Sequence, residues 1–304
     1  MTEHYPRVRI RSDYGLLTIR EALRLTFFMR HPHEAISPGV RRALESYLRA
    51  IGPDKLTLYA DPDMEWEYVE PTDWASVLEK VHDTEYASIQ LSGANDNHQA
   101  YRFDYHGRFS NNPGPFAKHH PGMVSKVTCL LPTEYMEEHG PGRVRELAME
   151  MASSLPFCTG YTGLAFSYDT GMISAHDEVR RLCFRHPGMD VSNMESISTD
   201  IGTQVRGATW LTFLGPPVLE ELGGATALRA LLQTPGTTVQ EMEGQRAVVT
   251  LGPWPEAGDL EKGQTLPAYR ELARVLEPWL FHEPHSHPSI DMTDTRRWER
   301  RFLD

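Results

Sequence analysis

Residues 251–278, LGPWPEAGDLEKGQTLPAYRELARVLEP, carry the clearest structural pattern in the chain. Pro253, Pro255 and Gly258 are turn residues, and Pro267 suits the first turn of a helix, where a missing N–H is tolerated. Apolar residues then recur at i, i+3, i+4 and i+7, the spacing of one helix face, until Pro278 stops the helix. They are Tyr269, Leu272, Ala273 and Leu276. We predict a half-buried helix here, with Asp259, Glu261 and Lys262 at an exposed turn before it.

Outside this stretch, apolar runs and helical spacings follow one another without a strict alternation. The runs predict strands at 16–29, 55–60, 86–91, 101–105, 124–131, 160–166 and 208–213, and a hairpin of 237–242 with 246–251. The spacings predict helices at 38–51, 73–81, 144–155, 177–184, 218–222 and 225–232, the first of them capped by Ser37 with Pro38 at its first position. Residues 189–204 show weak patterning and are expected to be irregular. The mixture predicts an α+β fold, with mixed, largely antiparallel sheets and packed helices.

The size and composition of the chain favour one large domain. Its 304 residues are 40% hydrophobic, enough for a sizeable core, and the short segment 156–160 is the nearest approach to a linker. We expect a single domain over 1–304; if it has two lobes, they meet near 156–160. The sequence contains no apolar run of 18 residues, no secretory signal and only three cysteines, so we expect a cytoplasmic protein without disulfides or membrane association.

The formal net charge of −12 limits the partners of the chain. Phosphates repel an acidic surface, so direct nucleic-acid binding is not expected. A basic protein surface is the partner that such a charge favours.

The most acidic segment is 61–73, which has six carboxylates and no basic residue. If it is extended, Asp61, Asp63, Glu65 and Glu67 lie on one side at about 7 Å intervals, and Trp66 lies on the other with Met64 and Tyr68. Such a row could mimic a phosphate track and bind a basic partner. The alternative is a solvated edge segment, because charges and Pro62 protect sheet edges from pairing.

Sequence patterns that would indicate catalysis are weaker than this acidic pattern. One group of possible metal ligands is His282, Glu283, His285 and His287. Their spacing is not that of a zinc motif, and Pro284 and Pro288 indicate a loop. A second histidine-rich loop contains the pair His119-His120. No nucleophile or phosphate-binding motif is present. We expect no catalytic residue, metal or cofactor. The rival hypothesis is a hydrolase or metalloenzyme built on the histidine-rich loops. The C-terminal Trp298, Arg300, Arg301 and Phe302 fit a segment clamped onto the core better than a partner site.

Several blocks of the sequence resemble one protein family, the bacterial type VI immunity proteins. The C-terminal block comprises Gly252-Pro253, Pro255, Gly258-Asp259, Leu266-Pro267, Tyr269-Arg270 and Pro278, followed by Trp298, Arg301 and Phe302. The upstream blocks are Gly160-Tyr161 with Gly163-Leu164-Ala165, and 210–215 leading to Leu222-Gly223-Gly224. Together they cover most of the chain.

This resemblance implies a function that the residues alone do not give. It implies an immunity protein and not an enzyme. Such a protein binds and blocks a toxin that a neighbouring cell delivers through its type VI secretion system. The implied toxin is a nuclease effector of the VRR-Nuc class. The toxin is expected to be encoded by an adjacent gene. A DNA-cleaving toxin needs a positive groove, so an acidic inhibitor would be attracted to it. The candidate toxin-binding residues are Asp61, Asp63, Glu65, Glu67 and Trp66.

Overall fold

The computed structural model describes residues 4–60, 65–69, 73–82, 87–93, 100–108, 120–169, 171–191, 194–284 and 290–304. In these ranges eleven strands form one sheet, in the order β10-β11-β9-β8-β2-β7-β6-β5-β3-β4, with β1 paired to β2 off this path. Every pairing between these strands is antiparallel. The α+β prediction is therefore confirmed.

The strands are β1 (Arg9–Arg11), β2 (Leu17–Met29), β3 (Leu58–Ala60), β4 (Trp66–Tyr68), β5 (Ser88–Ser92), β6 (Arg102–His106), β7 (Ser125–Pro132), β8 (Thr159–Tyr168), β9 (Leu211–Leu214), β10 (Thr237–Met242) and β11 (Arg246–Leu251). The helices are α1 (His33–Ile51), α2 (Trp74–Lys80), α4 (Thr133–Ser154), α5 (His176–Arg185), α6 (Met194–Asp200), α7 (Val218–Glu221), α8 (Gly224–Leu231), α9 (Pro267–Leu276) and α10 (Met292–Glu299). No helix of the described ranges is both long and apolar enough to cross a lipid bilayer.

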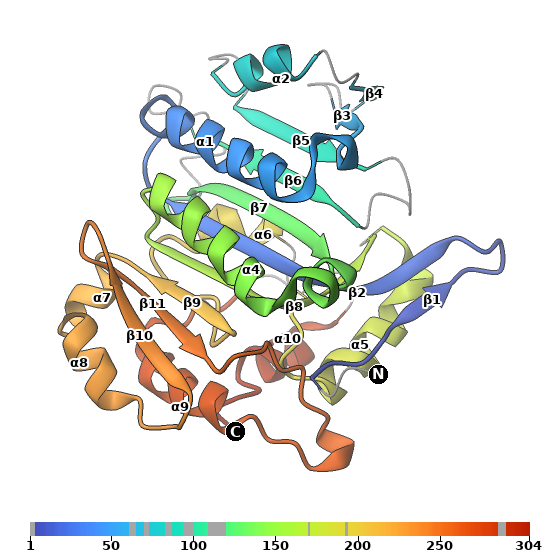
Figure 1. Cartoon of the computed structure of the whole chain (residues 1–304). Coiled ribbons are helices and arrows are strands. Elements are labelled where there is room, and N and C mark those ends of the chain that lie inside the picture. The colour runs from blue at the N-terminus through green and yellow to red at the C-terminus, as the bar shows by residue number, and fades with distance from the viewer. Residues whose placement is uncertain are drawn as a thin grey trace.

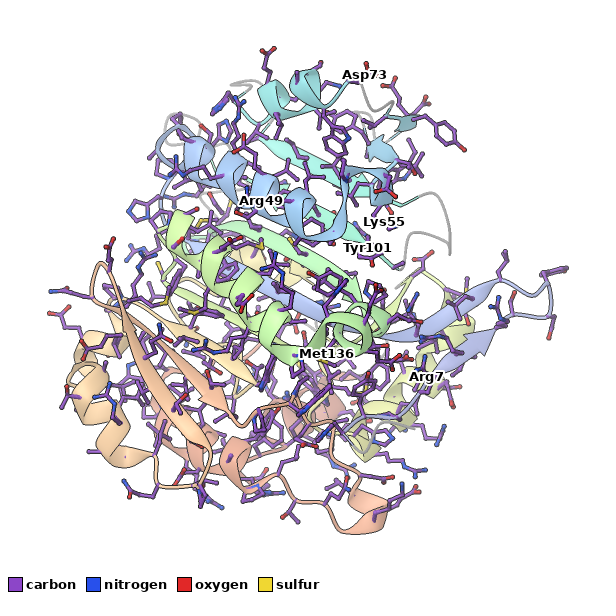
Figure 2. All side chains as sticks on the ribbon, in the orientation of Figure 1. Arg7, Arg49, Lys55, Asp73, Tyr101 and Met136 are labelled. Carbon is purple, nitrogen blue, oxygen red and sulfur yellow. The ribbon has the colours of Figure 1, made fainter. Side chains whose placement is uncertain are left out.

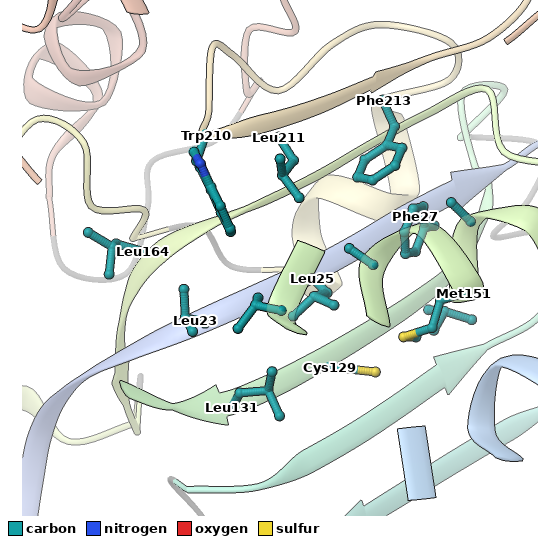
Figure 3. Packing of buried hydrophobic residues seen from close by; sticks show 14 of the residues in the cluster. Leu23, Leu25, Phe27, Cys129, Leu131, Met151, Leu164, Trp210, Leu211 and Phe213 are labelled. Atoms are coloured by element: carbon teal, nitrogen blue, oxygen red, sulfur yellow. The ribbon is translucent and has the colours of Figure 1, made fainter. Parts of the chain in front are cut away.

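Strand β2 lies at the centre of the sheet and is buried along all thirteen residues. It pairs with β7 on one side and with β8, the first strand of the second half of the chain, on the other. Leu23, Leu25 and Phe27 point to the face that α1 and α4 cover side by side (Figures 1 and 3). Phe28 points to the other face, where it packs with Ile197 of α6. Both halves of the chain thus contribute to one core.

Close packing at this central pairing requires a glycine. A Cβ on Gly160 of β8 would lie 2.7 Å from Cδ1 of Phe27 and 2.8 Å from the carbonyl oxygen of Thr26, so no larger residue fits without displacing β2. Gly160 is therefore a packing residue. The Phe27 ring in turn lies 5.1 Å, between centroids, from that of Phe213 in β9 and 5.8 Å from that of Phe157.

The helix that the opening stretch predicts is α9. Pro267 is its first residue, and Tyr269, Leu272, Ala273 and Leu276 are all buried, as expected. The turn before it differs from the prediction. Asp259 is buried, because its carboxylate accepts hydrogen bonds from Nε and Nη2 of Arg185, at 3.0 and 2.8 Å, and this contact lowers the pKa of Asp259 to about 2.

Three other predictions were wrong in detail. Helix α1 begins at His33, so that Pro38 lies in its interior. Residues distant in the sequence fix this earlier start. The His33 N–H donates to the Arg108 carbonyl at 2.5 Å, and the His33 ring lies 2.7 Å from the Tyr105 hydroxyl. Helix α4 begins at Thr133 and is broken at Gly140 (φ 80°). The segment 189–204, expected to be irregular, contains α6.

We predict that Phe27→Ala lowers the free energy of unfolding by about 3–5 kcal/mol, because the large ring is removed from a site that cannot collapse. Leu231→Ala, which truncates a side chain that is 50% exposed, is the matched control and should change it by about 0.5 kcal/mol or less. Urea unfolding followed by circular dichroism measures both. A change below about 1 kcal/mol for Phe27→Ala would show that the central pairing does not depend on this ring.

Candidate functional site

The acidic segment 61–73 includes β4, the outermost strand at one end of the sheet. β4 pairs with β3, with Leu58 opposite Tyr68 and Ala60 opposite Trp66. Glu65, Trp66, Glu67 and Tyr68 are all exposed, Trp66 by 37% and Tyr68 by 76%. Asp61 and Asp63 lie outside the described residues. The structure therefore places three of the five candidate toxin-binding residues together on the outermost strand at this end of the described sheet.

Alternation along β4 separates the acidic and aromatic side chains. Successive residues of a strand point to opposite faces, so Glu67 lies on the face of its partner Tyr59, whereas Trp66 and Tyr68 lie on the other. Lys80 of α2 covers the Tyr59 ring at 4.0 Å from its centroid. The edge thus offers a carboxylate on one face and two aromatic rings on the other, a combination suited to a basic protein surface.

The opposite end of the sheet is built differently. The outermost strand there is β10, and α8 packs along it (Figure 1). Arg229 of α8 donates from Nη2 to the carbonyl oxygen of Val239 at 2.9 Å, which occupies an outward-facing main-chain group of the strand. Among the described residues, β4 is consequently the more accessible of the two sheet edges.

The histidine-rich loops are only partly described. His282 Nδ1 lies 2.9 Å from Oε2 of the buried Glu299, which also accepts from the Glu283 N–H at 2.8 Å and from Arg296 at 3.0 Å. His120 Nδ1 similarly lies 2.9 Å from Asp200; His119, His285 and His287 lie outside the described residues. In the described ranges no three His, Cys, Asp or Glu side chains are grouped as metal ligands. The contacts of His282 instead hold its loop against α10.

The C-terminal segment is clamped onto the core, as the sequence indicated. Trp298 and Phe302 are buried, and the Arg301 guanidinium lies 3.6 Å from the Trp298 ring centroid. Arg301 also donates from Nε to the Pro187 carbonyl at 2.7 Å. Burial, with Arg206 nearby, lowers the pKa of Arg301 to about 9, so the group remains charged at neutral pH.

Sequence reasoning missed a buried ion pair beneath this clamp. Arg24 of β2 binds Asp190, with Nη1 2.7 Å from Oδ2, and the Tyr161 hydroxyl donates to the same oxygen at 2.8 Å. The available signal was Arg24 itself, a basic residue inside an apolar strand; its partner, 166 residues away, could not be identified from the pattern. Such a pair serves the fold, because leaving either charge alone in the core is costly.

The three cysteines are buried and make poor nucleophiles. Burial raises the pKa of Cys129, Cys158 and Cys183, the last to about 12, so these thiols are protonated at neutral pH and poorly reactive. A depression of about 560 Å³ lies between the α7–α8 corner and the β10–β11 hairpin, and Arg246 is a cation in its lining. That guanidinium is already bound to carbonyl oxygens, including those of Glu243 at 2.7 Å and Ala152 at 3.2 Å.

Comparison with known proteins gives a family. A family model described as type VI immunity for VRR-NUC matches residues 39–302. A solved structure, that of the Pseudomonas aeruginosa T6SS protein PA0821, superposes with a TM-score of 0.79 at 19% identity, covering 97% of this chain and 87% of that one. This likeness shows a shared fold. A search of curated proteins found no match.

We predict that replacing His282, His285 and His287 together by alanine leaves the zinc content of the purified protein unchanged, because a proline-bracketed loop with irregular spacing does not pre-position ligands. His282→Ala alone should lower the free energy of unfolding by about 1 kcal/mol through the lost contact with Glu299, and the exposed His31→Ala is the matched control. Elemental analysis and urea unfolding measure the two effects. One zinc per chain that disappears in the triple variant would favour a metalloenzyme instead.

Proposed function

The chain belongs to the family of type VI immunity proteins for VRR-NUC, and we propose that it binds one cognate toxin, a nuclease effector of a type VI secretion system, and neutralises it by covering its active site. The family match over residues 39–302 is the observation that carries this proposal. The proposed partner is encoded by an adjacent gene. The proposed place of action is the cytoplasm, where an incoming nuclease would meet DNA.

The chemistry of the chain supports inhibition by binding. A nuclease must keep a positive groove for its phosphate substrate, so it cannot neutralise that groove without losing activity. A protein with a net charge of −12 is attracted to the same groove. An inhibitor that targets the groove therefore exploits a feature that the toxin cannot easily change.

The exposed edge at β4 is the surface we propose for the first contact. Glu65 and Glu67 supply negative charge, while Trp66 and Tyr68 supply exposed aromatic area, and aromatic residues are enriched among those that dominate binding energy. Asp61 and Asp63, which precede them in the chain and lie outside the described residues, belong to the acidic row that we propose from the sequence. Charges at the rim of an interface act mainly on the association rate.

We predict that co-expression of this protein rescues growth of cells that express the adjacent gene's product, and that equimolar protein abolishes DNA cleavage by the purified toxin. A binding inhibitor must be present in stoichiometric amount, whereas an enzyme that destroys the toxin would act at a small fraction of it. Cleavage assays at increasing ratios measure this. An adjacent product that is harmless, or one that stays toxic beside this protein, would contradict the immunity function.

We predict that reversing Asp61, Asp63, Glu65 and Glu67 to Lys slows association with the toxin by about tenfold at low salt. The effect should fade with rising salt, because screening is strong beyond about 10 Å at 0.1 M. A smaller variant, Glu65→Lys with Glu67→Lys, has a matched control in Glu220→Lys with Glu241→Lys, which changes the net charge equally at the other end of the sheet.

Stopped-flow association rates across a salt series separate these variants. The Glu65/Glu67 variant should lose rate and salt dependence, while the Glu220/Glu241 control should change little. Folding should persist in the Glu65/Glu67 variant and in its control, since all four side chains are exposed and substitutions of exposed residues usually change stability by about 0.5 kcal/mol or less. If the fourfold reversal leaves both the rate and its salt slope unaltered, the acidic row is not the inhibitory surface.

A further inference from the structure

The hairpin of β1 and β2 projects from the body of the molecule. Its outer end stands clear of the neighbouring elements in Figure 1, and residues 12–16 form the turn between the two strands. At this tip Tyr14 is 92% exposed and Leu16 51% exposed. Single exposed apolar residues are common on proteins. Tyr14 differs because it lies on a projecting turn, where a concave partner surface can enclose it.

The turn that carries Tyr14 has a defined backbone. The Ser12 N–H donates to the Leu16 carbonyl at 2.8 Å and the Gly15 N–H donates to the Ser12 carbonyl at 2.9 Å. Arg11 closes the turn by donating from Nη1 to the Gly15 carbonyl at 2.8 Å. Gly15 has a φ of +79°, a conformation that side-chain-bearing residues rarely adopt. The backbone that carries Tyr14 is thus held by hydrogen bonds within the turn.

The base of the hairpin is held against α4 by ion pairs. Arg9 forms an ion pair with the buried Glu21. Its Nη2 also lies 2.5 Å from Oε1 of Glu134. Arg20 reaches the same Glu134 carboxylate at 2.6 Å. Arg7, on the segment that leads into β1 (Figure 2), pairs with Glu137 at 2.6 Å. These contacts fix the projecting strands relative to the body, so docking the tip loses little conformational entropy.

We infer that this hairpin tip, Asp13 to Leu16, is the element that enters the substrate cleft of the nuclease toxin. The inference rests on the proposed function. Asp13 and Tyr14 are both exposed at the tip, so they present a carboxylate beside an aromatic ring. In a nuclease cleft, the ring can stack where a base stacks and the carboxylate can meet the cations that hold phosphate. The tip therefore offers an aromatic ring and a carboxylate, and the Arg11 guanidinium, bound to the Gly15 carbonyl, lies in the same turn.

Its expected kinetic effect differs from that of the β4 edge. Rim charges such as Glu65 and Glu67 act on the association rate, whereas an anchor enclosed by the partner acts on the dissociation rate. Tyrosine is enriched among such anchors. The two surfaces can therefore be tested separately in one binding experiment.

The test replaces Tyr14 and Leu16 together by alanine in the full chain. We expect the dissociation constant for the purified toxin to rise at least tenfold, mainly through faster dissociation, with a parallel loss of inhibition. The melting temperature should not change, because both side chains are exposed. Tyr14→Phe should retain most of the affinity, and Asp13→Asn should weaken binding more at low salt than at high salt. Ile173→Ala, at a side chain that is 81% exposed, is the matched control and should bind as the wild type does.

A competition experiment tests whether the bound protein occupies the cleft, and the Tyr14/Leu16 variant tests whether the tip is the element that does so. A catalytically inactive toxin loaded with a duplex DNA oligonucleotide should exclude the wild-type protein. Simultaneous binding of both would overturn the cleft assignment together with the proposed cover of the active site. Wild-type affinity in the Tyr14/Leu16 variant would overturn the role of the hairpin alone and leave the immunity function intact. If the wild-type protein fails to bind the toxin at all, the proposed function falls and this inference falls with it.

Discussion

The antiparallel pairing of β2 with β8 is the contact on which the rest of the structure depends. β2 comes from the start of the chain and β8 from its middle, and their ladder runs from Ile19 opposite Tyr168 to Phe28 opposite Thr159. Because the rest of the sheet grows outward from this pair in both directions, the pairing sets where both edges lie. It also explains why β2 is buried throughout, with helices on one face and the C-terminal segments on the other.

Local sequence signals predicted those parts of the fold that local forces determine. Pro267 and the apolar stripe from Tyr269 to Leu276 gave α9, since proline position and helical spacing act within a few residues. Errors arose where distant contacts override local preference. His33 starts α1 a turn early because Tyr105 and Arg108 hold it, and Asp259 is buried because Arg185 neutralises it. Neither partner is visible in the sequence near these residues.

The candidate site was predictable to a similar extent. The alternating acidic and aromatic residues from Glu65 to Tyr68 predicted two opposite faces if the segment is extended, with a solvated edge segment as the alternative to a binding row; β4 is extended and lies at an edge of the sheet. Asp61 and Asp63 lie outside the described residues. The hairpin tip gave no distinct signal, because a Tyr-Gly turn after a strand looks alike whether it packs on the core or projects from it. What distinguishes Tyr14 is its exposure, a property of the three-dimensional arrangement.

The cover that α8 and Arg229 provide for β10 has a consequence for self-association. An edge strand can recruit the same strand of another molecule, and a sheet open at both ends can continue such stacking into a fibre. Here the described part of the sheet is accessible at the β4 end and obstructed at the β10 end. Edge-to-edge growth through the described strands would therefore terminate after one step, as a symmetric β4-to-β4 pair.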